Sequence, residues 1–196
     1  MKHSINYKIV LASNSPRRKE LLKGLDIDFE VRVIPDIDET HPQDVPPEEI
    51  PVRLARKKAD AYLSTISRKE LIITADTVVV LDNDVLEKPA GREEAVNMLK
   101  RLSGRKHRVI TAVALTTTDN RKEFSVTSTV DFAELTNEEI EYYVDKYKPF
   151  DKAGAYGIQE WIGYIGVRSI EGSFYNVMGL PIQRLYRELK NFRMSE

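Results

Sequence analysis

Two periodicities of apolar positions follow one another along the chain and predict strands and helices in turn. Runs rich in β-branched and aromatic residues are typical of strands, and apolar residues spaced three and four apart are typical of helices. The strand-like runs are Lys8–Ala12, Asp28–Ile34, Leu71–Leu81, His107–Thr118, Lys122–Glu134 and Gly163–Ile170. The helical patterns are Pro16–Lys23, Val52–Ser64, Arg92–Leu102, Asn137–Tyr147 and Leu180–Phe192.

Turn signals between these elements indicate how the strands connect. Asp82-Asn83 and Asp119-Asn120 are typical of hairpin turns, so some strand pairs are expected to be antiparallel. Thr136 and Glu139 have the spacing of a capping box at the start of a helix. The mixture predicts an α/β protein with a mixed sheet. The proline-rich stretch Pro35–Pro51 is short for a linker between domains, so we expect a single domain over residues 1–196.

The first predicted helix begins with an unusual concentration of positive charge. Ser15 is a favourable N-cap, and Pro16 suits the first helical position because its missing N–H has no partner there. Arg17 and Arg18 follow, although the helix dipole favours acidic side chains at this end. A bound phosphate would explain the two arginines. The alternative is a solvated helix start with two surface arginines.

Composition limits the classes of partner. The 196 residues include 30 basic and 31 acidic ones, giving a net charge of −1, so any anion site must be local. This balance indicates no nucleic-acid partner and no anionic membrane surface. The absence of cysteine excludes disulfides and thiolate chemistry, and the three histidines lie far apart. No apolar run approaches the roughly 20 residues of a membrane span, so we expect a soluble cytoplasmic protein.

A single acid interrupts the apolar strand Leu71–Leu81. Asp76 is flanked by β-branched and apolar residues, as in a strand buried on both faces. An unpaired carboxylate there would cost several kcal/mol, so it must meet cations, a metal ion or water. Asp76 is therefore a candidate general base or metal ligand. The alternative is a carboxylate at a bulge that accepts hydrogen bonds from nearby backbone amides.

Helical spacing separates two neighbouring lysines. Lys58 shares one face of its helix with Leu54, Ala61 and Tyr62, whereas Lys57 falls on the polar face. We therefore expect Lys58 to point toward the apolar neighbours and Lys57 to be solvated. The alternative for Lys58 is a side chain that extends along the apolar face to reach water.

Three loop positions add weaker signals. Lys88 lies in a proline- and glycine-containing loop, where functional residues are common. Asp38 and Glu39 are adjacent acids that would suit a hard cation, although such pairs are usually only solvated. Gln159 ends a stretch with two glycines, and its amide could read the edge of a base.

Taken together, these motifs resemble one family over nearly the whole chain, from Ile9 to Leu185. The matching segments, in family order, are Ser13-x-Ser15-Pro16-Arg17-Arg18-x-Glu20-Leu21-Leu22, Leu54-Ala55-x-x-Lys58-Ala59, Ala75-Asp76-Thr77 and Lys88-Pro89. They resemble the Maf family, whose members are nucleoside triphosphate pyrophosphatases historically linked to inhibition of septum formation. The resemblance implies an inosine-triphosphatase-like α/β fold. In that fold, helices flank a long, twisted mixed sheet, and two lobes enclose a central cleft. The protein is expected to be a homodimer.

The resemblance also implies roles for individual residues. Asp76 corresponds to the catalytic proton acceptor, and Glu39 to an acid that helps Asp76 hold a divalent cation, Mg²⁺ or Mn²⁺. The groups expected to neutralise the triphosphate are Ser13, Arg17, Arg18, Lys58 and Lys88. The implied products are a nucleoside monophosphate and pyrophosphate, in the clearing of modified or surplus nucleotides.

Two further stretches resemble the subgroup that hydrolyses dTTP and UTP. They are Gly154–Gln159 and Gly172–Pro181, and Arg17, Thr77 and Gln159 correspond to positions associated with pyrimidine specificity. One departure is Glu160-Trp161, where a glycine commonly follows the glutamine. Two alternatives stay open, namely a purine-type triphosphatase on the same fold and a nucleotide-binding regulator of division that acts through a partner protein.

Overall fold

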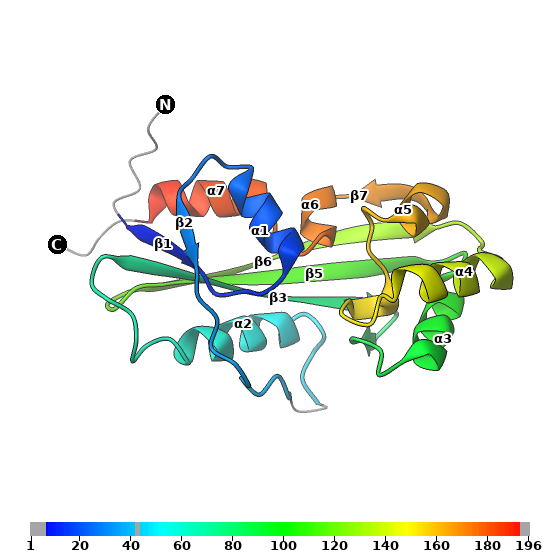
Figure 1. The fold of residues 1–196 in the computed structure, drawn as a ribbon, viewed down its shortest axis with the longest axis horizontal. Coiled ribbons are helices and arrows are strands. Elements are labelled where there is room, and N and C mark those ends of the chain that lie inside the picture. The colour runs from blue at the N-terminus through cyan, green and yellow to red at the C-terminus, as the bar shows by residue number, and fades with distance from the viewer. Residues whose placement is uncertain (1–6, 42–43, 193–196) are drawn as a thin grey trace. The chain divides into compact units, whose positions relative to one another are not determined.

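The computed structural model describes residues 7–41 and 44–192, which form an α/β fold (Figure 1). The strands are β1 Lys8–Leu11, β2 Phe29–Val31, β3 Glu70–Leu81, β4 Asp84–Leu86, β5 Lys106–Thr116, β6 Arg121–Phe132 and β7 Val167–Glu171. The helices are α1 Pro16–Lys23, α2 Ile50–Asp60, α3 Arg92–Leu102, α4 Asn137–Tyr147, α5 Trp161–Gly166, α6 Phe174–Val177 and α7 Ile182–Asn191, with a 3₁₀ turn, η1, at Ala153–Ala155.

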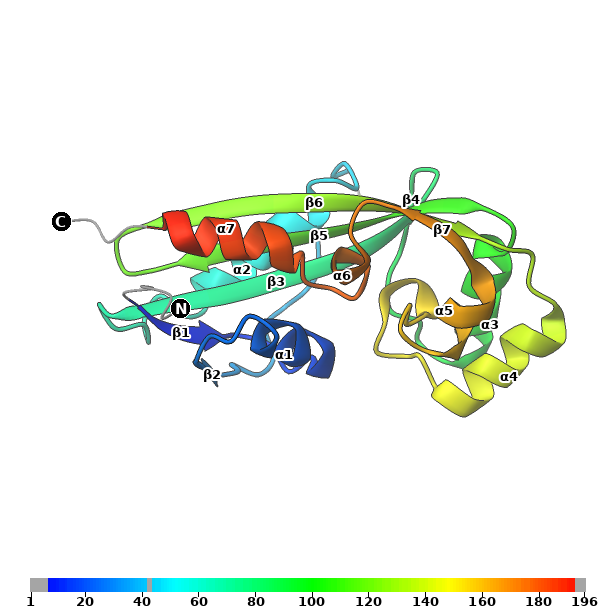
Figure 2. The same cartoon turned by 90° about the horizontal axis from the view of Figure 1, so that it is seen from above.

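The strands form a mixed sheet, as the sequence predicts. In the described part of the chain the sheet has seven strands in the order β2-β1-β3-β5-β6-β7, and β4 pairs with β3. Strand β1 lies parallel to both β2 and β3, whereas the β3–β4 and β6–β7 pairs are antiparallel. Figure 2 shows the long strands β3, β5 and β6 side by side.

The chain divides into two compact units. The first comprises residues 1–76, 111–126 and 179–196, and the second residues 77–110 and 127–178. Strands β3, β5 and β6 contribute residues to both units.

Small side chains allow α2 to pack closely on the sheet of the first unit. Ala55 and Ala59 of α2 form a buried cluster with Ala112 and Ala114 of β5. Helix α2 covers one face of this sheet, and α1 and α7 lie on the other face (Figure 1). Because both faces are covered, β3 is buried at nearly every position.

The core of the second unit contains a polar group among aromatic rings. His107, Phe132 and Tyr156 pack edge to face, with ring centroids 4.9–5.4 Å apart. His107 Nε2 and the Tyr156 hydroxyl are hydrogen-bonded at 2.7 Å, which pairs these two polar atoms inside the core. Burial lowers the pKa of His107 from 6.5 to about 4, because the charged imidazolium would lose its hydration.

Local sequence signals place the ends of α1, α3 and α4 correctly. Ser15 caps α1 by accepting a hydrogen bond from the Arg18 backbone N–H, and Pro16 occupies the first turn. Thr136 and Glu139 form the predicted capping box of α4. The bounds of α1, α3 and α4 are those expected. Helix α2 begins two residues earlier than predicted and ends at Asp60.

Both predicted turns are confirmed. Asp82 adopts a left-handed conformation (φ 56°) between β3 and the antiparallel β4. Between β5 and β6, the backbone N–H of Thr117 donates to Asn120 O at 2.9 Å, closing a connection short enough only for antiparallel strands.

The strand predicted over Gly163–Ile170 is wrong in its first half. Residues 161–166 form α5, and β7 begins only at Val167. The aromatic and β-branched composition favours a strand, but tertiary packing buries Ile162 and Gly166 on one side of a short helix. Gly163 also touches the preceding turn so closely that an added Cβ would lie 1.8 Å from Ile158 O. The short helix α6 was not predicted.

No helix in the described residues is both long and apolar enough to cross a lipid bilayer.

The buried histidine makes a testable contribution to acid sensitivity. An unfolded chain binds a proton on His107 below its ordinary pKa of 6.5, whereas the folded protein binds one only near pH 4. The free energy of unfolding should therefore fall as the pH decreases through this window, by about 3 kcal/mol at most. Denaturant titrations of wild type and His107→Phe between pH 7 and pH 4 measure the effect. The wild type should lose more stability than the variant, and parallel profiles would contradict the assignment.

Candidate active site

The centre of the candidate site is a buried ion pair between α2 and β3. Lys58 Nζ lies 2.7 Å from Asp76 Oδ1, and the two side chains are only 14% and 11% exposed. Side chains two apart on a strand share a face, so Thr74 points the same way as Asp76. The Thr74 hydroxyl donates to Ala55 O at 2.7 Å, and Ala55 is one turn before Lys58. Thr74 thereby fixes the register that brings Lys58 to Asp76.

A second carboxylate meets the same ammonium. Glu39 Oε1 lies 2.9 Å from Lys58 Nζ, so Lys58 joins the acid of the proline-rich segment to the acid of β3. Of the partners expected for Asp76, namely cations, a metal ion or water, the structure shows a cation, Lys58. The expected contrast between the lysines is also confirmed, since the Lys57 side chain is 41% exposed.

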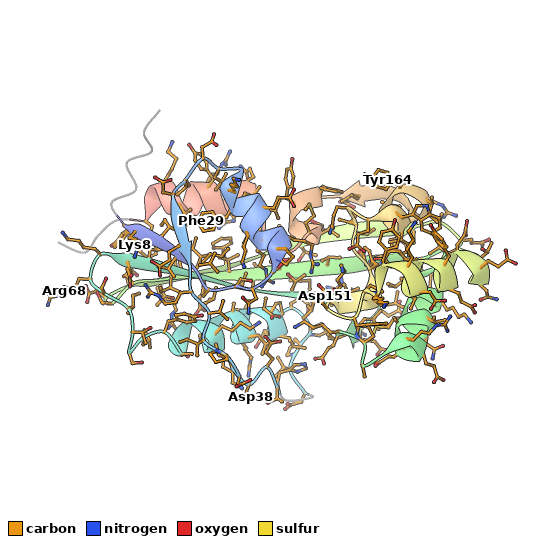
Figure 3. All side chains as sticks on the ribbon, in the orientation of Figure 1. Lys8, Phe29, Asp38, Arg68, Asp151 and Tyr164 are labelled. Carbon is orange, nitrogen blue, oxygen red and sulfur yellow. The ribbon has the colours of Figure 1, made fainter. Side chains whose placement is uncertain are left out.

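The neighbouring pair repeats this arrangement at the surface. Lys57 Nζ lies 2.6 Å from Asp38 Oδ2, and Asp38 Oδ1 accepts a hydrogen bond from the Thr40 backbone N–H. The hydrogen bond from Lys57, followed by that from Thr40, holds the pKa of Asp38 well below its usual range. Asp38 is labelled in Figure 3. Adjacent lysines thus hold adjacent acids, but the Lys58 side chain is 14% exposed whereas that of Lys57 is 41% exposed.

A tyrosine that sequence reasoning missed holds the segment leading to Glu39. The Tyr62 hydroxyl donates to Arg32 O and accepts from the Ile34 backbone N–H, both at 2.9 Å. Tyr62 is 2% exposed and follows the end of α2. Its apolar-face position predicted burial, but nothing in the sequence identified the backbone groups that its hydroxyl would meet.

Arg18 connects the start of α1 to the strand that carries Asp76. Its Nε donates to Gly179 O at 2.8 Å, and its Nη1 donates to Ala75 O at 2.9 Å. Burial lowers the pKa of the Arg18 guanidinium, while the negative charges of Asp76 and Glu39 act in the opposite direction. Arg18 therefore belongs to the same electrostatic cluster and also orients the backbone next to Asp76.

Ser13 lies where β1 passes into α1. The Ala12 backbone N–H donates to Ile73 O at 2.9 Å, which continues the pairing of β1 with β3. Ser13 is 8% exposed, and its Oγ accepts from the Ser15 backbone N–H at 3.2 Å. The carboxyl end of β1 and the first turn of α1, including Arg17, are thus held beside β3 in the first unit.

The remaining predicted residues belong to the second unit. Thr77 follows Asp76 in β3, and Lys88 is exposed in the loop after β4. That loop is tied to the stretch preceding Gln159, because the Gly154 backbone N–H donates to Glu87 O at 3.2 Å. Gly154 has a φ of 68°, and an added Cβ would lie 3.0 Å from the Val79 side chain.

Gln159 carries an unsatisfied acceptor. Its Oε1 atom is buried and has no hydrogen-bond partner among the described residues. Buried polar atoms are nearly always paired in folded proteins, so an orphaned acceptor points to a group that arrives from outside.

In the predicted 172–181 stretch, Gly172 and Asn176 have a structural role. Asn176 is fully buried, and its Nδ2 donates to Val109 O at 3.1 Å and to Ser128 Oγ at 3.0 Å. Gly172 has a φ of 108°, and an added Cβ would lie 2.8 Å from Ser128 Oγ. The glycine and the amide therefore attach this segment to β5 and β6.

The two carboxylates on Lys58 also fit a divalent cation. No group of three or more metal-binding side chains occurs in residues 7–41 and 44–192. Magnesium needs fewer, because it is commonly held by one or two carboxylates together with substrate phosphates and water. Glu39 and Asp76 have the donor chemistry for that arrangement.

The sequence matches the family model described as "Maf-like protein" over residues 8–192. The chain belongs to the Maf family. A relative from Bacteroides thetaiotaomicron is 63% identical over 184 residues, covering 94% of this chain and 95% of the relative. Another from Parabacteroides distasonis is 64% identical over 186 residues, covering 95% and 96%. Both relatives are named dTTP/UTP pyrophosphatase.

A solved structure supports the expected fold of this Maf protein. The Ham1 protein of Staphylococcus aureus is 19% identical, with a TM-score of 0.53, and the match covers 92% of this chain and 99% of that one. At this identity the likeness shows the fold alone. It confirms the inosine-triphosphatase-like α/β fold.

The contrast between Lys57 and Lys58 predicts opposite outcomes for two neighbouring substitutions. Lys58→Ala should lower kcat/KM by about 10²-fold with dTTP or UTP, the nucleotides named for the relatives, because a buried cation is lost from the carboxylate cluster. Lys57→Ala should lower it by about fivefold at most, because the pair it breaks is exposed. Steady-state rates, with thermal melts to confirm folding, measure both. Equal effects, or a larger effect at Lys57, would contradict the assignment.

Proposed function

We propose that the protein is a nucleoside triphosphate pyrophosphatase that hydrolyses dTTP and UTP to the monophosphate and pyrophosphate. The observation that carries this proposal is the buried Lys58 ammonium held between the carboxylates of Asp76 and Glu39. The names of relatives that are 56–64% identical over most of the chain support the substrate class.

In this proposal Asp76 is the general base. It takes a proton from a water molecule whose oxygen attacks the α-phosphorus, while the bond from that phosphorus to the bridging oxygen breaks and pyrophosphate leaves. Lys58 fixes the Asp76 carboxylate at Oδ1. The position of Asp76 inside a rigid, buried strand limits its movement, as precise proton transfer requires.

The cationic side chains supply charge for the triphosphate. Arg17, Lys58 and Lys88 are proposed to contact phosphate oxygens, with Ser13 donating from the loop before α1. Arg18 adds positive charge and keeps the backbone beside Asp76 in place through Ala75 O and Gly179 O. Positioned cations are the main source of catalysis in phosphoryl chemistry.

A divalent cation, Mg²⁺ or Mn²⁺, completes the proposed chemistry. Glu39 and Asp76 would hold it, and its charge would offset that of the phosphate oxygens.

Gln159 is proposed to recognise the nucleobase of the substrate. Uracil and thymine present an N–H between two carbonyl groups, so an amide can accept from the N–H and donate to an adjacent oxygen. The buried Gln159 Oε1 supports this assignment because it has no partner among the described residues. With the amide held in this orientation, Oε1 faces the ring-nitrogen acceptor of cytosine and is left unsatisfied. Arg17 and Thr77 are proposed to complete the pyrimidine specificity.

The wider proposal is one Maf-like domain over residues 1–196 that works as a cytoplasmic homodimer on free nucleotides. The family model, which runs through both compact units, supports a single domain. A division regulator that acts only through a partner protein would have no need of a general base. The pairing of Asp76 with Lys58 therefore favours the enzyme.

Removal of the proposed base gives the most direct test. Asp76→Asn should keep the fold and lose at least about 10²-fold in kcat, because the amide cannot accept the proton from water. Pyrophosphate release is measured with dTTP, after circular dichroism has confirmed folding. Turnover near the wild-type rate would overturn the role of Asp76.

The proposed base recognition predicts a ranking of substrates. dTTP and UTP should have higher kcat/KM values than CTP, ATP and GTP. Cytosine leaves a buried acceptor unpaired at a cost of about 1–3 kcal/mol, which corresponds to about 5- to 150-fold, and a purine needs a larger pocket. Gln159→Ala should narrow the gap, mainly by slowing the preferred substrates. A wild-type preference for CTP or a purine would refute the pyrimidine assignment while leaving the pyrophosphatase assignment intact.

A further inference from the structure

A polar cluster in the second unit holds the turn that carries Gln159. The Tyr143 hydroxyl on α4 donates to Glu160 Oε2 and accepts from the Gly157 backbone N–H at 3.0 Å. Lys152 Nζ lies 3.2 Å from Glu160 Oε1 and 2.7 Å from Asp151 Oδ1. Asp151 is labelled in Figure 3, in the loop after α4. The cluster therefore connects α4 and that loop to both ends of the 157–160 turn.

Most of this cluster is buried. Tyr143 is fully buried, the Lys152 side chain is 9% exposed and that of Glu160 is 20% exposed. Burial, followed by the hydrogen bond to Glu160, raises the pKa of Tyr143, so the phenol stays neutral and donates its proton to the carboxylate. A buried pair of charges is costly to desolvate and adds little net stability, so its contribution must be sought in the geometry that it fixes.

Gln159 lies inside the turn that the cluster holds. The Glu160 backbone N–H donates to Gly157 O at 2.9 Å, which closes a four-residue turn with Gln159 at its third position. Glu160 folds back over Gly157 so closely that an added Cβ on the glycine would lie 2.7 Å from Glu160 Cδ. One tyrosine hydroxyl is thus bonded to the first and the last residue of the turn.

The residue after Glu160 also faces α4. The Trp161 indole packs edge to face on Tyr142, with ring centroids 4.9 Å apart. Glu160 and Trp161 are therefore both used in contacts with α4.

We propose that Tyr143 and Glu160 are positioning residues that set the orientation of the Gln159 amide and thereby the choice of base. The inference rests on the proposed reading of uracil and thymine by Gln159. An amide that must match two adjacent groups of a base loses both hydrogen bonds when its backbone turn rotates. Glu160 fixes the turn through its side-chain contacts with Tyr143 and Lys152.

The test compares UTP with CTP, which differ in the base edge that Gln159 is proposed to read. Tyr143→Phe and Glu160→Ala should each reduce the ratio of the two kcat/KM values by about tenfold, through a higher KM for UTP and little change in kcat. Glu160→Gln keeps an acceptor for the Tyr143 hydroxyl and should retain the ratio within about threefold. The Cβ added in Gly157→Ala would displace the Glu160 carboxylate. This variant should therefore reduce the UTP-to-CTP ratio of kcat/KM values as Glu160→Ala does.

Tyr142→Phe is the matched control, because Tyr142 lies on the same helix, is 45% exposed and accepts a hydrogen bond from Lys146 Nζ at 2.7 Å. It should leave the UTP-to-CTP ratio unchanged. If the wild type prefers UTP over CTP and the folded Tyr143→Phe and Glu160→Ala variants keep the same preference, the positioning role is overturned and the proposed function stands. Equal losses on UTP and CTP would also overturn it, because they would show a merely structural role. A wild type without preference for UTP would refute the base assignment and this inference with it.

Discussion

A carboxylate inside an apolar strand has to be paired within the fold, and this requirement organises the first unit around Asp76. Removing one partner from a buried ion pair typically costs about 3–5 kcal/mol, because the other charge is left unpaired. Lys58 meets the requirement from α2 at 2.7 Å, and it brings Glu39 to the same point. The pair fixes the relation of three segments that are distant in sequence.

The surrounding structure allows this contact to form. Ala55 and Ala59 let α2 approach the sheet, and the Thr74 hydroxyl bonded to Ala55 O sets the helix along β3. Arg18 holds the carbonyl of Ala75 on the other side of the same strand segment. The same residues that stabilise the packing therefore orient the proposed base, because a buried strand moves less than a surface loop.

The two polar clusters have different proposed roles. The Lys58 cluster concentrates opposite charges and suits proton transfer and phosphate chemistry. The Tyr143–Glu160–Lys152 cluster lies behind a neutral amide whose buried oxygen lacks a partner among the described residues. The residues Lys58 and Asp76 of the first cluster and Tyr143 and Glu160 of the second belong to different compact units.

Local chemistry was sufficient to predict many elements from the sequence. Caps and helical periodicity located α1, α3 and α4, since a hydroxyl before a helix and apolar spacing act within a few residues. The face assignment of Lys58 and the need of Asp76 for a cation also followed from spacing and burial. Motif resemblance identified the family. The short α5 was predicted as a strand because its composition favours one, and only packing against Ile158 and the core decides the helix.

The tertiary structure determined which side chains contact one another. Spacing predicted that Lys58 faces inward, but it could not show that one ammonium would contact both Asp76 and Glu39. The sequence singled out Glu160 only as a departure from the family pattern, and Tyr143 only as part of a predicted helix, yet the two share a hydrogen bond. Periodicity and capping report interactions within a few residues. Contacts between distant segments depend on how the chain folds back on itself, and no local pattern encodes them.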